Sequence, residues 1–451
     1  MTTTRVARRA RVRVPTWLLG TGIIAVAMGV MNVSTYGFTI LAARLLGPEQ
    51  YGALAALMGL LLVVNVLSLG LQATAARRVS AAPEHTSTIE PAILSVSYRS
   101  ALGLALVCLL ASPAINAVLH LNDWVSAALV AVTVIPLTIM GGQAGVLQGE
   151  RRWIPLALIY LTSGLGRLLC GLVALLIRPD QFGAMVGVAV GAFFPIVVGW
   201  FALRHPTRAT QHGTYADTPT APAPAPAPAP APVDDRMAAR RLIREVAHNS
   251  HALLAFFALS NADVIVARTT LPEHQAGLYA GGLILAKAVL FLPQFVVVIA
   301  FPSMASAGAR RSLHLRSLGL VLGIGLMAVA GAAVLSSLAV VFIGGGQYAA
   351  LQGTIWAYAG LGTLLAMIQL MVYDVVARQH QRAVYWIWGA LGVLLCTIPL
   401  IGSVNTLLTI VVCIDLALLM ILVVVNLRRP DAAPPVPPAP PAARREDAPV
   451  G

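Results

Sequence analysis

The sequence predicts an all-α polytopic membrane protein with about twelve transmembrane helices in two pseudo-symmetric six-helix lobes. The first observation is composition: 58% of the 451 residues are hydrophobic and only 10% are charged, with a mean hydropathy of +0.82. Because a soluble protein of this length could not bury so much apolar side chain, lipid must surround most of the chain. The other two observations are a regular series of long apolar segments and an internal repeat.

The internal repeat divides the chain into two matching halves. The motif Ala-Arg-x-x-x-Pro-Glu at residues 43–49 recurs at 267–273, and Leu-Gly-x-Leu-Leu-Cys at 165–170 recurs at 391–396. Both repeats have nearly the same offset, and each copy lies at the matching place in the series of apolar segments. Duplicated halves within a membrane are typical of transporters in which one half rocks against the other.

Apolar segments long enough to cross a bilayer occur twelve times, since one crossing requires about 20 apolar residues. We expect spans at about 17–42, 51–76, 97–118, 123–148, 153–178, 182–203, 247–268, 276–301, 317–341, 350–376, 383–401 and 404–427. These spans give an N-lobe (17–203) and a C-lobe (247–427), together with a basic N-terminus (1–16), an Ala/Pro-rich linker (204–246) and a Pro-rich tail (428–451).

Basic residues gather on one side of the membrane in this arrangement. The net charge is +13, and most arginines lie in the N-terminus, the linker, the tail and the loops on their side; Arg44, Arg178 and Arg268 are exceptions. The positive-inside rule therefore predicts a cell (plasma) membrane protein with both termini in the cytoplasm. The basic excess indicates topology and attraction to anionic membrane lipids, and we expect no nucleic-acid partner.

The linker and the tail contain segments that cannot form a packed core. Alternating Ala-Pro at residues 221–232 favours polyproline II, which acts as a semi-rigid spacer. Residues 234–244 begin with acidic side chains and continue with mixed basic and apolar ones. They predict either an amphipathic helix on the inner membrane surface or a solvated linker. The Pro-rich tail is expected to be disordered.

Sequence motifs of catalysis are absent from the chain. No Walker motif, HExxH, GxSxG or metal-ligand cluster occurs, and the loops on the outer side are short. All four cysteines lie inside apolar segments without CxxC spacing. We therefore expect a protein that is not an enzyme and has no cofactor and no bound metal. Any uphill transport would then depend on an ion gradient or on the gradient of the substrate itself.

Three ionisable residues are expected near the middle of the membrane, namely Arg167, Lys287 and Asp415. Each costs roughly 2.5–3.5 kcal/mol on insertion scales, so each requires an explanation. Lys287 is the only lysine of the chain, and Arg167 lies at a similar depth in the other half. Two cations placed in this way would suit an anionic headgroup such as a pyrophosphate bound between the halves. The alternative is a structural ion pair between Lys287 and Asp415.

Three further polar residues lie within expected spans. Asn261 and Asp263 are two positions apart in span seven, about 200° around the helix, so both cannot face one cavity. Asp263 is a candidate proton or cation site, or an ion-pair partner of Lys287 or Arg268. Asn32 lies in the corresponding span of the first half and is a further candidate for the cavity lining.

Arg44 and Arg268 depart from the positive-inside pattern at equivalent places of the repeat. Each precedes by four residues a proline that opens the next helix. We expect a structural role, in which the guanidinium bonds carbonyls at the end of its own preceding helix, while Glu49 or Glu273 favours the positive end of the next helix. A gate or a headgroup contact is the alternative.

Several stretches resemble the polysaccharide-transporter flippases of the multidrug/oligosaccharidyl-lipid/polysaccharide (MOP) exporter superfamily. Residues 40–52, Ile-Leu-Ala-Ala-Arg-Leu-Leu-Gly-Pro-Glu-Gln-Tyr-Gly, are similar to the first-loop signature of that family. The resemblance extends over about residues 17–427. Further similar stretches are Leu-Gly-Leu-Gln at 69–72 with Arg-Arg at 77–78, Gln-Gly-Glu-Arg-Arg at 148–152, Asn-Ala-Asp at 261–263, Ala-Gly-Leu-Tyr-Ala at 276–280 and Phe-Pro at 301–302.

The resemblance implies a MATE-like fold, with two six-helix lobes that face a V-shaped cavity opening alternately inward and outward. It implies that a polyprenyl-pyrophosphate-linked oligosaccharide is turned from the inner to the outer leaflet, and that Lys287, Asp263 and Arg167 belong to the charged cavity. Glycosyltransferases or a polysaccharide polymerase are the protein partners that such a role would imply. The Ala-Pro insert and the tail depart from the family pattern, and the two further spans usual in lipid II flippases are missing.

Two other functions remain compatible with the sequence. A multidrug exporter on the same fold would exchange cationic drugs for protons or sodium, and its cavity should be lined by acids and aromatics. A membrane scaffold that recruits glycosyltransferases through the linker would have no need of ionisable residues within its spans. Lys287 and Arg167 near mid-depth favour an anionic lipid over both alternatives.

Overall fold

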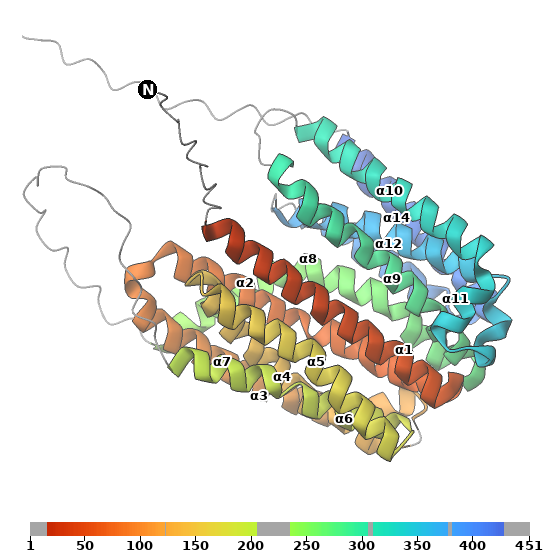
Figure 1. Cartoon of the computed structure of the whole chain (residues 1–451), viewed down its shortest axis with the longest axis horizontal. Coiled ribbons are helices and arrows are strands. Elements are labelled where there is room, and N and C mark those ends of the chain that lie inside the picture. The colour runs from red at the N-terminus through yellow and green to blue at the C-terminus, as the bar shows by residue number, and fades with distance from the viewer. Residues whose placement is uncertain (1–15, 122, 205–234, 305–309, 378–380, 428–451) are drawn as a thin grey trace, which may run out of the picture.

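The computed structural model describes residues 16–121, 123–204, 235–304, 310–377 and 381–427, which form a bundle of helices (Figure 1). The α-helices are α1 (Thr16–Val64), α2 (Val66–Ala81), α3 (Thr86–Val118), α4 (Trp124–Gly149), α5 (Trp153–Ile177), α6 (Gln181–Gly191), α7 (Phe194–Arg204), α8 (Asp235–Thr270), α9 (Glu273–Met304), α10 (Arg310–Val334), α11 (Ser336–Ile343), α12 (Ile355–Ala377), α13 (Gln381–Cys396) and α14 (Val404–Leu427). Short 3-10 turns lie at Pro83–His85, Gly346–Leu351 and Ile398–Leu400.

The prediction of an all-α protein with about twelve membrane crossings is confirmed. Nine helical stretches of the described residues are long and apolar enough to cross a membrane. The stretch Gly22–Ala81 has 60 residues, about 90 Å of helix, which is far more than a bilayer core of about 30 Å requires. This stretch makes two crossings, and α9 and α13 complete the twelve.

The turn between the first two crossings lies at Gly47, inside α1. Gly47 has φ 69° and ψ 175°, a conformation that glycine adopts at little cost, and Pro48 follows it. The expected loop between spans one and two is therefore a sharp kink at Gly47, where two helical segments of α1 meet.

Several expected crossings are interrupted and one begins earlier than expected. Span two is divided between α1 and α2 at Asn65, span six into α6 and α7, and span nine into α10 and α11. α8 begins at Asp235, so the segment expected as a separate surface helix or as linker is helical and continuous with span seven. The basic N-terminus, the Ala-Pro run and the Pro-rich tail lie outside the described residues.

The helices of the two halves occupy opposite sides of the bundle (Figure 1). We call the end with residues 43–51 and 268–275 the distal end, and the end where α1 begins and α7 finishes the proximal end. One cluster of buried apolar residues, which includes Leu54 and Tyr279, joins both halves toward the distal end. Nearer the proximal end each half has separate clusters, around Phe256 in the second half and around Leu147 in the first. The halves are therefore packed together most completely at the distal end.

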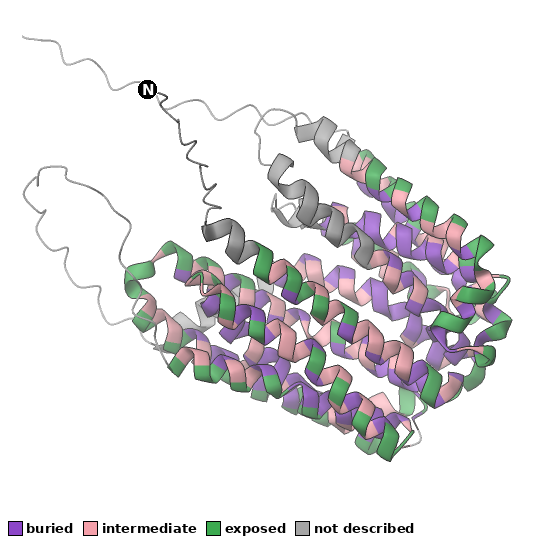
Figure 2. Ribbon diagram, in the orientation of Figure 1, coloured by how far each residue is buried: buried purple, intermediate pink, exposed green. Residues whose placement is uncertain are grey.

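The outer surface of the bundle is apolar, as a lipid-facing surface requires. Leu110, Ile177 and Val334 are 73%, 79% and 82% exposed. Figure 2 shows exposed positions along the outward faces of the helices and buried positions toward the middle. An apolar surface of this extent is explained by lipid contact, because soluble proteins expose only small apolar patches.

Candidate functional site

A cavity of about 170 Å³ lies between the two halves and is lined by α1, α4, α5, α8 and α9. Its lining is mixed, with apolar side chains such as Leu54 and Leu283 beside polar ones. The polar side chains of the lining are Asn32, Thr35, Tyr36, Thr39, Tyr51, Asn65, Arg167 and Lys287.

Arg167 reaches the cavity from the middle of α5. Gly164 and Gly166 bring the backbone of α5 close to its neighbours, because a Cβ on Gly164 would lie 2.6 Å from Met31 Cα and one on Gly166 2.8 Å from the Gly191 carbonyl oxygen. Within the described part of the chain the Arg167 guanidinium has no hydrogen bond or ion pair. It is therefore a cation that faces the cavity with no counter-charge in the described lining.

Lys287 reaches the same cavity from α9 in the other half. Its Nζ donates a hydrogen bond of 2.9 Å to Oδ1 of Asn261 on α8, and Asp263 attracts it electrostatically. The partner of the ammonium is thus an amide oxygen, and among the described residues no ion pair joins Lys287 to Asp415. The alternative expectation of a Lys287–Asp415 pair does not describe this structure.

Asn261, Asp263 and Asp415 lie behind Lys287 and outside the described lining of the cavity. Asp263 is 2% exposed and accepts hydrogen bonds from the hydroxyl of Tyr279, at 3.0 Å, and from the Val264 amide, at 2.8 Å. Asp415 on α14 is also 2% exposed; its Oδ2 has no hydrogen-bond partner among the described residues, and it interacts electrostatically with Asp263. These residues form a buried polar layer that supports the lysine.

The first half contributes a polar stripe that our reading of the sequence missed except for Asn32. Asn32, Thr35, Tyr36 and Thr39 all line the cavity from α1. Their spacing of three and four residues places them on one helix face, a signal that could have been found in so apolar a segment. The Tyr36 hydroxyl donates a hydrogen bond of 2.7 Å to the Ile284 carbonyl oxygen, so this stripe also joins the two halves within the cavity.

Arg44 and Arg268 lie at the distal end, away from the cavity. We expected each guanidinium to bond carbonyls at the end of its own preceding helix, and this expectation is wrong. Arg44 donates to the Val341 carbonyl oxygen, and Arg268 donates to the Leu119 and His120 carbonyl oxygens. Each arginine therefore bonds a carbonyl of the other half, because the halves are closely packed at this end.

The cavity can accommodate negative charge. Its described lining contains two cations, one from each half, and no carboxylate. Side-chain amides and hydroxyls around them can donate hydrogen bonds to oxygen atoms of a ligand. The described residues contain no group of three or more His, Cys, Asp or Glu side chains that could hold a metal ion. Anion binding is the chemistry that this arrangement supports.

Comparisons with known proteins agree on family and fold. A family model described as polysaccharide biosynthesis protein matches residues 18–308. A search of curated proteins gives no match. Similar solved structures include a multidrug resistance MATE family transporter of the MOP superfamily in its inward-facing conformation, with 11% identity, a TM-score of 0.61 and coverage of 90% of this chain and 98% of that one.

Two further structures extend the likeness. A multidrug resistance MATE family transporter of the MOP superfamily in its outward-facing conformation has 12% identity, a TM-score of 0.55 and coverage of 91% of this chain and 96% of that one. A eukaryotic MATE transporter has 12% identity, a TM-score of 0.53 and coverage of 90% and 95%. At such identities the likeness shows the fold alone.

Proposed function

The chain belongs to the family of polysaccharide biosynthesis proteins, and we propose that it is a flippase for a polyprenyl-pyrophosphate-linked oligosaccharide. The substrate would pass from the inner to the outer leaflet by alternating access. The fold and the family are those of MOP transporters, which supports transport as the general activity. The identity of the substrate and the direction of its transport are our proposal.

The single observation that carries the proposal is the pair of cations in one cavity between the halves. Arg167 enters from the first half and Lys287 from the second, and the described lining holds no acid. A pyrophosphate carries several negative charges and oxygen acceptors that suit a guanidinium and an ammonium. Because the two cations belong to different halves, one bound headgroup would contact both lobes and move with them.

The arrangement also suits a glycolipid, which combines a polar headgroup with an apolar tail. A sugar pyrophosphate cannot cross hydrocarbon unaided, since unsatisfied polar groups there cost several kcal/mol each. The polyprenyl tail has the opposite preference and remains in lipid. A site between two lobes, beside an apolar outer surface, can hold the headgroup while the tail stays outside.

Orientation follows from the distribution of basic residues, which assigns the proximal end to the cytoplasm. The shared core at the distal end then closes the outer side. On this assignment the structure corresponds to a state that would receive its substrate from the inner leaflet of the plasma membrane. Glycosyltransferases that build the substrate and a polymerase that uses it are the partners implied.

Two experiments test the proposal. Deletion of the gene should cause lipid-linked sugars to accumulate inside the cell, and analysis of those sugars would identify the glycan. Purified protein in liposomes should accelerate the transfer of a fluorescent polyprenyl-pyrophosphate sugar between leaflets. Transfer of a cationic dye driven by a proton or sodium gradient, without transfer of the glycolipid, would instead show a multidrug antiporter. Transfer of neither compound would favour a scaffold.

A further inference from the structure

We infer that Arg44 and Arg268 form two reciprocal clasps that hold the distal end shut, each capping a helix end of the opposite half. The inference rests on the two-half architecture and on contacts at the distal end, and it does not depend on which substrate is carried. It assigns to the repeated Ala-Arg-x-x-x-Pro-Glu motif a role as a gate.

The clasp of Arg268 joins the end of α8 to the end of α3. Arg268 Nε donates to the Leu119 carbonyl oxygen at 2.9 Å, and Nη2 donates to the His120 carbonyl oxygen at 3.0 Å and contacts Glu273 Oε1 at 3.1 Å. Leu119 is the C-cap of α3, and His120 has φ 46°, so the chain turns away from the helix there. The last carbonyls of a helix have no partner within it and carry partial negative charge, which a buried guanidinium satisfies.

The clasp of Arg44 runs in the opposite direction. Arg44 lies on α1 in the first half, and its Nη2 donates a hydrogen bond of 2.6 Å to the carbonyl oxygen of Val341, in the last turn of α11 in the second half. Beside it the Tyr348 hydroxyl donates to the Ala43 carbonyl oxygen at 3.3 Å. This clasp is more exposed than the first, since Arg268 is only 3% exposed whereas Arg44 is exposed at the surface.

The two clasps are related by the duplication of the chain. Arg44 and Arg268 occupy the same position in the repeated motif, at the end of the first span of each half. Their acceptors also correspond, because α3 is the third span of the first half, and α10 with α11 forms the third span of the second. One motif copied twice thus provides two contacts of opposite direction across one interface.

The backbones behind the clasps are in close contact. A Cβ added to Gly277 would collide with the Pro48 carbonyl, and one added to Gly52 would lie 2.9 Å from Gly277 Cα. α9 therefore packs directly on the kink of α1. The clasps act on an interface that is already close-packed. Their loss should therefore shift the equilibrium between the closed and open forms of the distal end without changing the closed structure.

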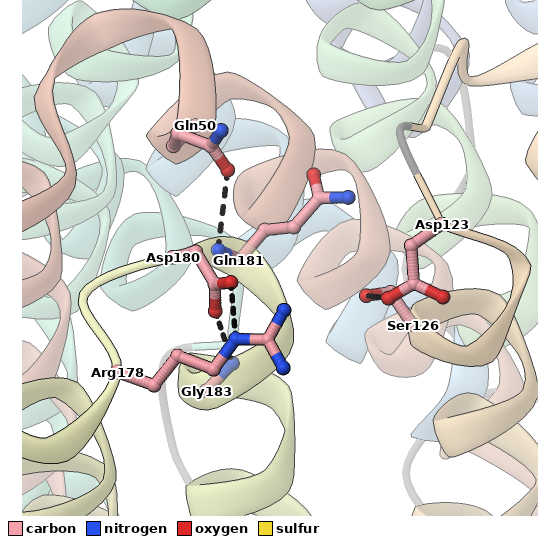
Figure 3. A network of polar contacts seen from close by, with 7 residues as sticks. All are labelled: Gln50, Asp123, Ser126, Arg178, Asp180, Gln181 and Gly183. Atoms are coloured by element: carbon pink, nitrogen blue, oxygen red, sulfur yellow. Dashed lines mark hydrogen bonds and ion pairs between the residues drawn. The ribbon is translucent and has the colours of Figure 1, made fainter.

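A third arginine at the same end provides a matched control. Arg178 Nε lies 2.6 Å from Asp180 Oδ2, and Asp180 Oδ1 accepts from the Gly183 amide, so these contacts remain within the first half (Figure 3). Gln50 likewise accepts a hydrogen bond from the Gln181 amide of the same half. Loss of the Arg178 side chain removes a distal positive charge without removing a contact between the halves.

The test measures opening of the distal end directly in the full-length protein. Spin labels on Trp124→Cys and Gln352→Cys, two exposed positions in different halves, report the distance between the halves in a background without native cysteines. The parent should show one short distance. Arg44→Ala and Arg268→Ala should each populate a longer distance, because a hydrogen bond to a charged group is worth about tenfold or more in an equilibrium.

The controls distinguish a gate from general destabilisation. Arg178→Ala should leave the distance distribution of the parent unchanged, and Arg44→Lys should retain more of the short distance than Arg44→Ala. If Arg268→Ala fails to fold because its site is buried, Arg268→Lys and Arg44→Ala still decide the matter. A distribution for Arg44→Ala that matches those of the parent and of Arg178→Ala would overturn the inference.

Discussion

Replacement of Lys287 tests whether the cavity binds an anionic headgroup, and its expected effect has two parts. Lys287→Met keeps the length of the side chain and removes the charge. A hydrogen bond between charged groups contributes about 1.5–3 kcal/mol, so pyrophosphate binding should weaken roughly 10- to 150-fold. The same change deprives Asn261 Oδ1 of its donor and leaves Asp263 without the cation that attracts it. Because an uncompensated buried charge costs about 3–5 kcal/mol, the single variant should also be less stable.

A double variant separates the two parts. Lys287→Met combined with Asp263→Asn removes one positive and one negative charge from the same buried layer, so most of the lost stability should return. Binding of the headgroup should not return, because the cation that faces the cavity is still missing. Asp263→Asn alone is the matched control, since it retains Lys287 and should bind the probe at least as well as the parent.

The assay combines two measurements on purified protein. Thermal unfolding reports stability, and titration with inorganic pyrophosphate and with a short-chain polyprenyl pyrophosphate reports affinity. We expect the double variant to unfold near the temperature of the parent and to bind both probes at least tenfold more weakly. A double variant that regains stability and binds both probes like the parent would refute the reasoning, because Lys287 would then be only the counter-charge of the buried carboxylates.

Three further outcomes are expected. Arg167→Gln should weaken pyrophosphate binding about tenfold without loss of thermal stability, since its guanidinium has no partner among the described residues; a large fall in unfolding temperature would contradict this. Asp180→Ala should lower the free energy of unfolding by about 1 kcal/mol, measured by denaturant titration, because Asp180 caps α6 through the Gly183 amide. Replacement of the Ala-Pro run at 221–232 by Gly-Ser of equal length should leave glycolipid transfer in liposomes nearly unchanged, and lost transfer would show that stiffness of the spacer matters.

The span architecture was predictable because lipid imposes a strong and local constraint on sequence. Each crossing needs about 20 apolar residues, so the spans could be counted without knowledge of their contacts. The bend at Gly47 was also visible in the sequence, where a glycine precedes Pro48. A helix starting at residues 234–235 was one of the two alternatives, but its continuity with span seven in α8 was not visible, because the expected break at residues 245–246 has no helix-ending signal that could be tested in the sequence.

The candidate site was predictable only in part. Arg167 and Lys287 stood out because each is an expensive charge in an apolar span, and both line one cavity. Asn261 and Asp263 were expected not to face one cavity together. Neither belongs to the described lining; Asn261 bonds Lys287, and Asp263 bonds Tyr279 and also interacts electrostatically with Lys287. Asn261 and Asp263 lie behind Lys287 because of the way α8 packs on α9. The sequence does not show this packing. Their roles in transport stay predictions.

The acceptors of Arg44 and Arg268 could not have been derived from the sequence. Every residue has a backbone carbonyl, so the sequence does not show which one an arginine will bond. The carbonyls of Leu119 and Val341 are also far from the arginines along the chain. Reasoning from local neighbours assigned each guanidinium to its own helix. Only the contact between the halves reveals that the repeated motif works across the interface.

The gate and the cavity are connected by two unbroken helical segments. On α1, Tyr36 in the cavity and Arg44 at the gate are eight residues apart, about 12 Å, and on α8, Asn261 and Arg268 are seven residues apart, about 10 Å. A headgroup that draws Lys287 away from Asn261 therefore acts on the helix that ends at a clasp. Coupling between two equilibria is reciprocal, so if headgroup binding favours opening, Arg268→Lys must change pyrophosphate affinity without contacting the ligand. Equal affinities in Arg268→Lys and the parent, together with an open gate, would mean that the clasps and the cavity work independently.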